Sequence, residues 1–194
     1  MSGESKPQSV ARAIGHVMRE STTQMPPSVT AIGPAAINQA VKAIAIARRQ
    51  ATTDGTALEL TVRPEFEAGL RDGSSVVLTL SKSMTRVADP TDDDDTLSAK
   101  PTTDAFKLAG AIAGRMRENQ KCAVEVKGAV PVLVALKAIA KAQEYLNADA
   151  PTLKLGFVAA LVDRENKSLR NAPTSTFTAL SVIALPAAAV AEGA

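Results

Sequence analysis

Few side chains of this sequence could carry covalent or acid–base chemistry. Its 194 residues include one cysteine, Cys122, and one histidine, His16, which lie far apart in the chain. A single His without a neighbouring Cys or a nucleophilic serine motif cannot form a catalytic triad or the usual metal site. The alternating run around Cys122 indicates a buried thiol rather than a reactive one. We therefore expect a non-enzymatic protein with no catalytic residue, no metal site and no cofactor.

One polar pair could still bind a ligand. Asn38 and Gln39 lie in AIGPAAINQAVKAIAIARRQ, residues 31–50, close to the start of an expected helix. Free N–H groups at a helix N-terminus favour anions, so the pair could bind an anion or only pin a loop by hydrogen bonds. The stretch lacks the second glycine and the Lys-Ser/Thr of a phosphate-binding P-loop. Both interpretations remain open at this point.

The composition allows a buried core but gives little material for stacking on nucleic-acid bases. Hydrophobic residues make up 45% of the chain, yet only four Phe and one Tyr are aromatic. Exposed aromatic platforms are therefore nearly excluded. The single cysteine excludes an internal disulfide, and no apolar run reaches the roughly 20 residues of a membrane span. We expect a soluble cytosolic protein without a membrane partner.

A tandem repeat organises the chain. GPAAINQAVKAIAIA from Gly33 aligns with GAVPVLVALKAIAKA from Gly128 at an offset of 95 residues. LELTV at 58–62 aligns with LKLGF at 153–157 at the same offset, and AIGHVMRE at 13–20 resembles AIAGRMRE at 111–118. Such self-similarity predicts two copies of one structural unit of roughly 90 residues.

An acidic segment separates the two copies. The first 88 residues carry a net charge of +3, residues 89–99 carry −5, and the remainder carries +4. A proline and four consecutive Asp disfavour regular structure, which predicts a solvated linker. The run could alternatively bind a basic partner or a divalent cation, although it lacks the spaced ligands of a calcium loop. The expected division is domain 1 at 1–87, linker at 88–100, domain 2 at 101–186 and an Ala-rich tail at 187–194.

Periodicity and turn residues predict the same order of elements, α-β-α-β-β, in each unit. In the first unit we expect helices at 8–21 and 34–50 and strands at 29–32, 57–63 and 75–81. In the second unit we expect helices at 103–119 and 130–147 and strands at 123–127, 153–161 and 176–185. Pro34 suits a first helical turn, where its missing N–H is no loss.

The run KPQSVARAIGHVMRE followed by VTAIGPAAINQAVKAIAIARRQ resembles the stage V sporulation protein S family. The second unit keeps SAKP, LAGAIAGRMRE, the glycine and KAIA, but lacks Asn-Gln. The resemblance implies an α+β fold of two Alba-like units, (β)αβαββ, with two helices on one face of a small mixed sheet. The first strand of that fold is nearly absent in unit 1 and is at most TLSA in unit 2. An open sheet edge in unit 1 would invite strand exchange with another chain.

Two functions compete for the outward faces of the long helices. Tandem copies of this domain are similar to a flagella-associated microtubule inner protein, which implies tubulin and neighbouring axonemal proteins as partners and a ciliary or flagellar location in the cytoskeleton. The alternative is a DNA- or RNA-binding protein of the nucleus or cytosol, with Lys6 and Lys100 as further contacts. The candidate partner-binding residues combine basic positions, which either partner could use, with apolar positions that suit a protein partner, and a helical wheel directs most of them outward. These residues are Lys42, Ile46, Arg48, Arg49, Leu133, Val134, Lys137 and Lys141.

Overall fold

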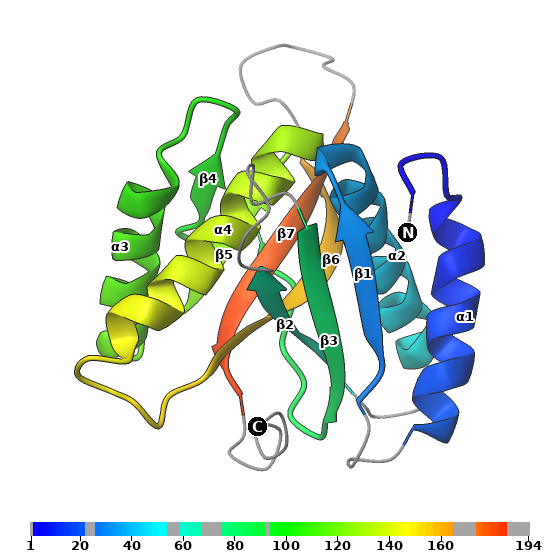
Figure 1. Ribbon diagram of the computed structural model, residues 1–194, viewed down its shortest axis with the longest axis horizontal. Coiled ribbons are helices and arrows are strands. Elements are labelled where there is room, and N and C mark those ends of the chain that lie inside the picture. Colours follow the sequence, from blue (N-terminus) through cyan, green and yellow to red (C-terminus); the bar gives the residue numbers. More distant parts are fainter. Residues whose placement is uncertain are drawn as a thin grey trace.

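The computed structural model describes residues 2–21, 26–53, 59–66, 75–91, 94–164 and 174–185. These residues form four helices and one seven-stranded mixed sheet (Figure 1). The expected α+β fold of two Alba-like units is confirmed. Two expected turns, RDGS at 71–74 and most of the long hairpin after residue 164, lie outside the described residues.

Unit 1 consists of two helices and three strands. The elements are α1 (Pro7–Glu20), β1 (Ser28–Ile32), α2 (Pro34–Thr53), β2 (Glu59–Phe66) and β3 (Ser75–Ser83). α1 buries Ala11, Ile14 and Met18, whose spacing of three and four residues places them on one face of the helix. Gly33 has φ +84°, a conformation that favours glycine and lets the chain turn sharply from β1 into α2.

Unit 2 repeats this order with one extra strand in front. Its elements are β4 (Leu97–Ala99), α3 (Ala105–Arg117), β5 (Cys122–Val126), α4 (Ala129–Leu146), β6 (Leu155–Arg164) and β7 (Ser175–Ala184). The Asp104 carboxylate caps α3 by accepting the N–H of Phe106 at 2.8 Å. Gly128, with φ +102°, makes the same turn into α4 as Gly33 makes into α2. All ten expected helices and strands are present, with ends shifted by a few residues.

The two units join edge to edge. The strand order is β1-β3-β2-β6-β7-β5-β4, so β2 of unit 1 meets β6 of unit 2. Their antiparallel register pairs Val62 with Phe157, residues that are equivalent in the 95-residue repeat. A contact between equivalent positions is the mark of an isologous interface, in which a pseudo-two-fold axis relates the two halves. The fused chain therefore has the form of a symmetric dimer.

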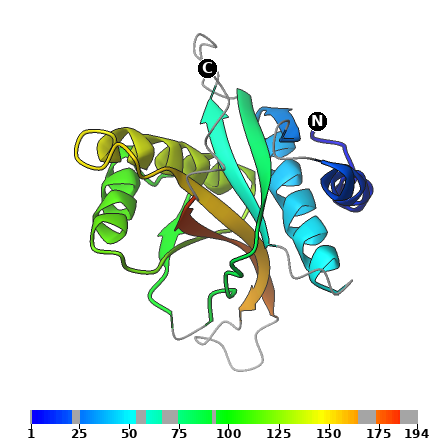
Figure 2. The same ribbon diagram turned by 90° about the horizontal axis from the view of Figure 1, so that it is seen from below.

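The contacts of the long helices α2 and α4 follow the same pseudo-two-fold symmetry. α2 packs against β6, α4 packs against β2, and the equivalent helices α2 and α4 contact each other. Figure 2 shows α1 and α2 at one end of the molecule, α3 and α4 at the other, and the strands between them. The central strands are accordingly buried on both faces, with Leu155–Ala160 of β6 inaccessible along their whole length.

The boundary between linker and second unit differs from the expected one. Leu97, Ser98 and Ala99 run parallel to β5 and pair with Val124, Glu125 and Val126 as the first strand of unit 2. The expected strand at TLSA is thus confirmed, and the linker is shorter than 88–100. Placing these residues in the linker was wrong, because the acidic run before them obscured a three-residue strand.

The junction predicts a strict size limit at Gly156. A Cβ there would lie 2.8 Å from the Val62 carbonyl oxygen and 2.6 Å from Cδ2 of Leu185, closer than packed atoms approach. We expect Gly156→Ala to lower the free energy of unfolding by about 1–3 kcal/mol in denaturant titrations. Gly110→Ala on α3 is the control, since its Cβ would meet nothing within 4 Å and alanine favours helix. Equal stability of both variants would contradict the close approach.

Candidate functional site

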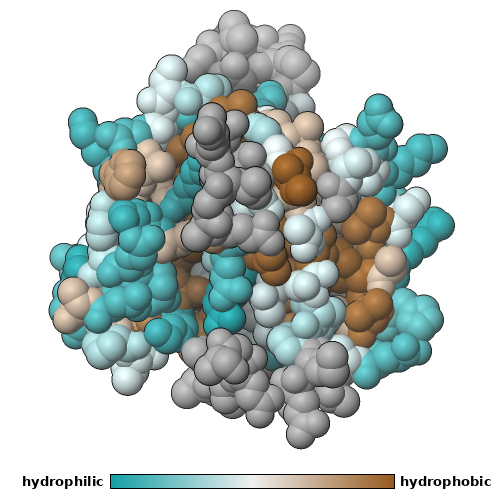
Figure 3. Space-filling model, in the orientation of Figure 1, coloured by the Kyte–Doolittle hydropathy of each residue, from teal (hydrophilic) through white to brown (hydrophobic). Residues whose placement is uncertain are grey.

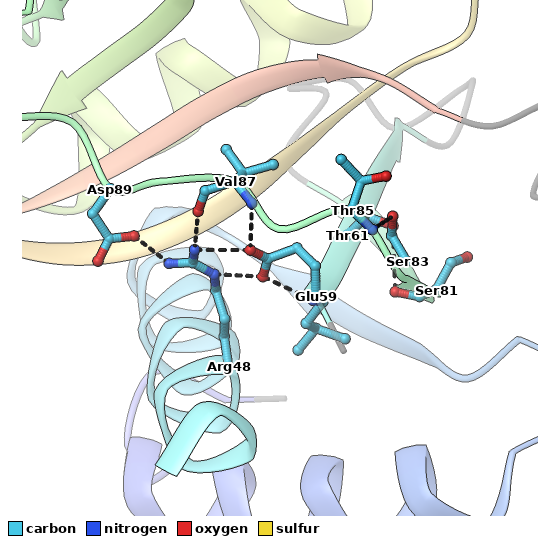
Figure 4. Close-up of polar contacts among 9 residues, drawn as sticks. Arg48, Glu59, Thr61, Ser81, Ser83, Thr85, Val87 and Asp89 are labelled. Atoms are coloured by element: carbon cyan, nitrogen blue, oxygen red, sulfur yellow. Dashed lines mark hydrogen bonds and ion pairs between the residues drawn. The ribbon is translucent and has the colours of Figure 1, made fainter. Parts of the chain in front are cut away.

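A network of buried polar contacts centres on the guanidinium of Arg48, near the end of α2 (Figure 4). Nε and Nη2 donate to the two carboxylate oxygens of Glu59, the first residue of β2, at 2.6 and 2.9 Å. Nη2 also donates to the Val87 carbonyl at 2.6 Å, and Nη1 pairs with Asp89. The side chains of Arg48 and Glu59 are 9% and 2% exposed. The pair thus fixes α2, the start of β2 and the linker to one another.

Two carboxylates hold this buried cation in its charged form. Burial alone would raise the pKa of Glu59, but hydrogen bonds from Arg48 and the Val87 N–H outweigh it and hold the pKa below its ordinary value. Burial opposes the charge of Arg48 too, and the bonds to Glu59 and Asp89 raise its pKa above the ordinary value. The carboxylates of Glu59 and Asp89 thus compensate the buried charge of Arg48.

The residue of unit 2 equivalent to Arg48 is the uncharged Gln143, which links its helix to the following strand as Arg48 does. Its Oε1 accepts the N–H of Leu155, the first residue of β6, at 2.6 Å, and its Nε2 donates to the Leu153 carbonyl at 3.0 Å. Both side chains tie the long helix to the strand that follows. Only Arg48 also reaches the linker, because its longer cationic side chain can bind a carboxylate and a carbonyl together.

Unit 2 holds the linker from the other side. Arg164 of β6 donates to the Pro90 carbonyl at 2.9 Å and pairs with Glu125 of β5. Arg115 of α3 donates to the Asp95 carbonyl and carboxylate at 2.6 and 2.7 Å. Most described linker residues before β4 are exposed and irregular, as expected of a solvated linker, but arginines from both units bind it at Asp89, Pro90 and Asp95.

A pocket opens beside this cluster, where α2, the linker and β6 converge. Its lining residues are Ala45, Arg48, Arg49, Arg86, Asp89, Ala160 and Leu161. Three arginines, Arg48, Arg49 and Arg86, line the pocket beside the Asp89 carboxylate. The pocket mixes cationic groups, one carboxylate and an apolar wall, a combination suited to a polar protein surface.

Several predicted partner-binding residues do not face outward. Arg48 is buried in its ion pair, and Ile46, Leu133 and Val134 are half-buried and pack against the core. Arg48 is therefore no exposed contact, whereas the three half-buried side chains remain predicted partner-binding residues; the helical wheel had assumed that only one face of each helix is covered. In the fold α2 contacts α1, its own sheet, α4 and β6, and this covers most of its circumference.

The other predicted basic residues remain at least partly accessible. Arg49, Lys6 and Lys100 are exposed, whereas Lys42 and Lys137 are half-buried. Lys141 pairs with Glu144 and lies 5.6 and 5.8 Å from the ring centroids of Phe106 and Tyr145. These lysines and arginines lie on different elements at both ends of the molecule and do not form one continuous stripe.

Asn38 occupies an unusual position at the start of α2. Its Oδ1 is buried and has no hydrogen-bond partner among the described residues. The equivalent residue of unit 2 is Leu133, which packs against the core. A buried acceptor oxygen repels an anion, so the orientation of Asn38 does not favour a phosphate grip. The neighbouring Gln39 is half-buried.

The two residues with the most reactive side chains are separated in the fold. His16 is exposed on α1, 3.5 Å from Glu20, whereas Cys122 is buried in β5 as expected. Burial raises the pKa of the Cys122 thiol to about 11, which disfavours the nucleophilic thiolate. Within the described ranges, no three His, Cys, Asp or Glu side chains gather into a metal site. In the same part of the chain, no helix is both long and apolar enough to cross a membrane.

Glu59, Asp89, Glu125 and Arg164 were not among the residues predicted to matter. Arg48 and Glu59 are eleven positions apart, on a helix and the next strand, and periodicity within one element does not connect them. Comparison with Gln143 in the repeat would have been the one available signal, since it marks Arg48 as a position where the two units differ.

Comparison with known proteins identifies the repeated unit. The profile of the family described as stage V sporulation protein S (SpoVS) matches residues 1–78 and again residues 95–169. The second match begins just before β4, in agreement with the position of that strand. A search of curated proteins found no match to the chain.

Breaking the Arg48–Glu59 pair should destabilise the protein and reverse how the Glu59 contribution to stability changes with pH. Arg48→Met leaves a buried carboxylate unpaired, for which we expect a loss of about 3–5 kcal/mol. In the parent, the low pKa of Glu59 adds stability above its unfolded pKa of about 4.3, and this contribution disappears as the pH falls through the folded pKa. Without Arg48, burial raises that pKa, so the Glu59 contribution should instead improve on acidification.

Denaturant titrations between pH 3 and pH 7 test this expectation. Arg12→Met, at an exposed position of α1, is the matched control and should change stability by less than about 0.5 kcal/mol. Adding Glu59→Leu to Arg48→Met should recover much of the loss, since it removes the unpaired charge. Identical pH profiles for the parent and Arg48→Met would contradict the pairing.

Replacing Asn38 by the residue of the equivalent position should stabilise the fold. Asn38→Leu removes a buried acceptor without a described partner and copies Leu133, so we expect a gain of about 1 kcal/mol in unfolding free energy. Gln39→Val, which copies Val134, is the matched control with no such buried atom. A loss of stability in Asn38→Leu would instead establish the loop-pinning role for Asn38.

Proposed function

Since the chain belongs to the stage V sporulation protein S family and carries two copies of its domain, we propose that it is a non-enzymatic scaffold protein that binds other proteins. The observation that carries this proposal is the continuous sheet through both units. Pairing of β2 with β6 joins the two small domains into one unit with helices and strands exposed on several sides. Such a body suits the cross-linking of fixed neighbours better than the enclosure of a substrate.

The linker, which arginines of both units bind, supports a structural role. Arg48 from unit 1 and Arg164 from unit 2 bind neighbouring residues of the linker, Asp89 and Pro90. A tether held in this way restricts motion of one unit relative to the other, whereas a free acidic linker would let them separate. Restricted motion favours a component that holds its partners at a fixed spacing.

We further propose that the assembly is the lumen of ciliary or flagellar doublet microtubules. This step rests on the similarity of tandem domains of this kind to a flagella-associated microtubule inner protein. Tubulin is strongly acidic, and the predicted partner-binding residues Arg49, Lys42 and Lys137, which are at least partly accessible, carry the complementary charge. Tubulin and neighbouring axonemal proteins are then the partners, and the axoneme is the location.

Nucleic-acid binding is the second candidate, and one observation favours it. Lys6 and Lys100 are both exposed, Lys6 directly before α1 and Lys100 in the turn between β4 and α3, so each unit presents one cation near the entry to its first helix. Against it, Arg48 and Lys141 are already paired with carboxylates of the chain. Fewer available cations mean less counterion release and a weaker interaction with phosphates.

Fractionation combined with a binding titration separates the two candidates. We expect tagged protein in flagellated cells to remain with axonemes after a high-salt wash, because a protein built into the microtubule lumen is held by many contacts. The matched variant Lys6→Glu/Lys100→Glu should be retained equally. For a nucleic-acid binder, the same variant would weaken duplex binding and reduce the salt slope by about 2. Submicromolar, strongly salt-dependent duplex binding without axonemal retention would overturn the scaffold proposal.

A further inference from the structure

The pocket between α2, the linker and β6 is small and partly open to solvent. Its volume is about 80 Å³. Pockets that hold a cofactor or a drug-sized ligand are larger, about 300–1,000 Å³. This pocket therefore has room for one side chain or one small ion, and it is too small for a nucleotide.

The walls of the pocket offer an apolar part and a polar part. Ala160 and Leu161 of β6 belong to the apolar part. Arg48 belongs to the polar part, but its Nε, Nη1 and Nη2 atoms all donate within the buried network described above. Arg48 therefore holds the pocket in shape, and a ligand needs another donor.

Arg86, which lies between β3 and the linker, is that donor. Its side chain is exposed, and among the described residues it has no hydrogen bond or ion pair. Hydrophilic side chains are spread over both sides of the face in Figure 3, so an exposed charge alone does not mark a site. Arg86 differs from such residues because it borders a pocket with an apolar wall.

The repeat shows that the fold does not require these residues. At the offset of 95, the pocket residue Arg49 corresponds to Glu144, and the wall residue Ala160 corresponds to Glu65. The equivalent place in the other half of the molecule thus carries two carboxylates. Packing that both halves share therefore does not account for the arginines and the small wall residue of this pocket.

The chemistry of the pocket favours a carboxylate with an apolar stem. A guanidinium binds a planar carboxylate through two parallel N–H···O bonds, which Arg86 is available to make. The Asp89 carboxylate also lines the pocket, with its side chain 54% exposed, and it repels a phosphate dianion more than a monoanion. The wall of Ala160 and Leu161 suits methylene groups. A glutamate side chain combines these properties.

We propose that the pocket receives a glutamate side chain of a partner protein, with its carboxylate on Arg86 and its methylene groups against Ala160 and Leu161. One carboxylate binds weakly by itself, so the site acts as one anchor within a larger interface. The proposal deepens the proposed function by naming a contact that an acidic protein partner makes. It relies on that function only for the existence of such a partner.

Small carboxylates test the pocket on the purified full-length protein by NMR titration above neutral pH. The probes are acetate, butyrate, neutral butyramide and inorganic phosphate. We expect butyrate to bind about fivefold more tightly than acetate, because its two further methylene groups are partly buried on the apolar wall. Butyramide and phosphate should each bind about fivefold more weakly than butyrate. The Nε–H signal of Arg86 and the methyl signals of Leu161 should shift together.

Three variants assign the binding to Arg86. Arg86→Gln should weaken butyrate binding about tenfold and leave stability unchanged, since the side chain has no described partner. Arg86→Lys keeps the charge without the paired donors, so its affinity should lie between those of the parent and Arg86→Gln. Arg12→Gln removes an exposed arginine of α1 outside the pocket and is the matched control, which should bind butyrate as the parent does.

Four outcomes would overturn the proposal. Phosphate binding more tightly than butyrate would identify a phosphate site, as in a nucleic-acid binder. Equal affinities of the parent and Arg86→Gln would exclude Arg86 as the donor. Shifts of Arg86 without shifts of Leu161 would place the carboxylate on the surface, and no saturable butyrate binding would exclude the site. None of these measurements uses axonemes or tubulin, so failure of the pocket and failure of the proposed function are distinguishable.

Discussion

The pairing of β2 with β6 is the contact on which the architecture depends. Each unit alone would end in an edge strand with unsatisfied backbone groups and an apolar helix beside it, and such edges associate readily. Joining equivalent edges about Val62 and Phe157 satisfies both strands with one contact. It also brings α2 and α4 together, so that each helix packs on a strand of the other unit. The repeat thereby acts as a dimer whose two protomers cannot dissociate.

This junction explains why small and aliphatic residues fill the centre of the molecule. The middle of β6 reads Gly156, Phe157, Val158, Ala159 and Ala160, so a single large side chain, Phe157, lies among small and aliphatic ones. Charges that enter this region need compensation, because burial of an unpaired ion is costly. Arg48 meets that need through Glu59 and Asp89, which is also why the linker follows a fixed path.

The sequence was a good guide to whatever is local to one unit. Helix and strand positions follow from hydrophobic period, and the glycines that turn into α2 and α4 mark the same corner twice. Burial of Ile46 and Arg48 could not be predicted in this way, because it arises from contacts that no single-unit pattern records. A helical wheel assigns one inner face, whereas α2 lies between α1, the sheet, α4 and β6. The arginines that bind the linker were missed for the same reason, since they come from three separate elements.

Differences between equivalent positions carry the functional information that either unit alone lacks. Core positions such as Ile44 and Ile139 keep one chemistry in both halves, because both halves must fold. Arg48 against Gln143 differs because only the first unit must hold a linker that leaves it. Arg115 differs from its equivalent Val17 because Arg115 binds the Asp95 carboxylate before β4, whereas Val17 is exposed. Duplication thus lets equivalent positions of one fold hold different neighbouring segments of the same chain.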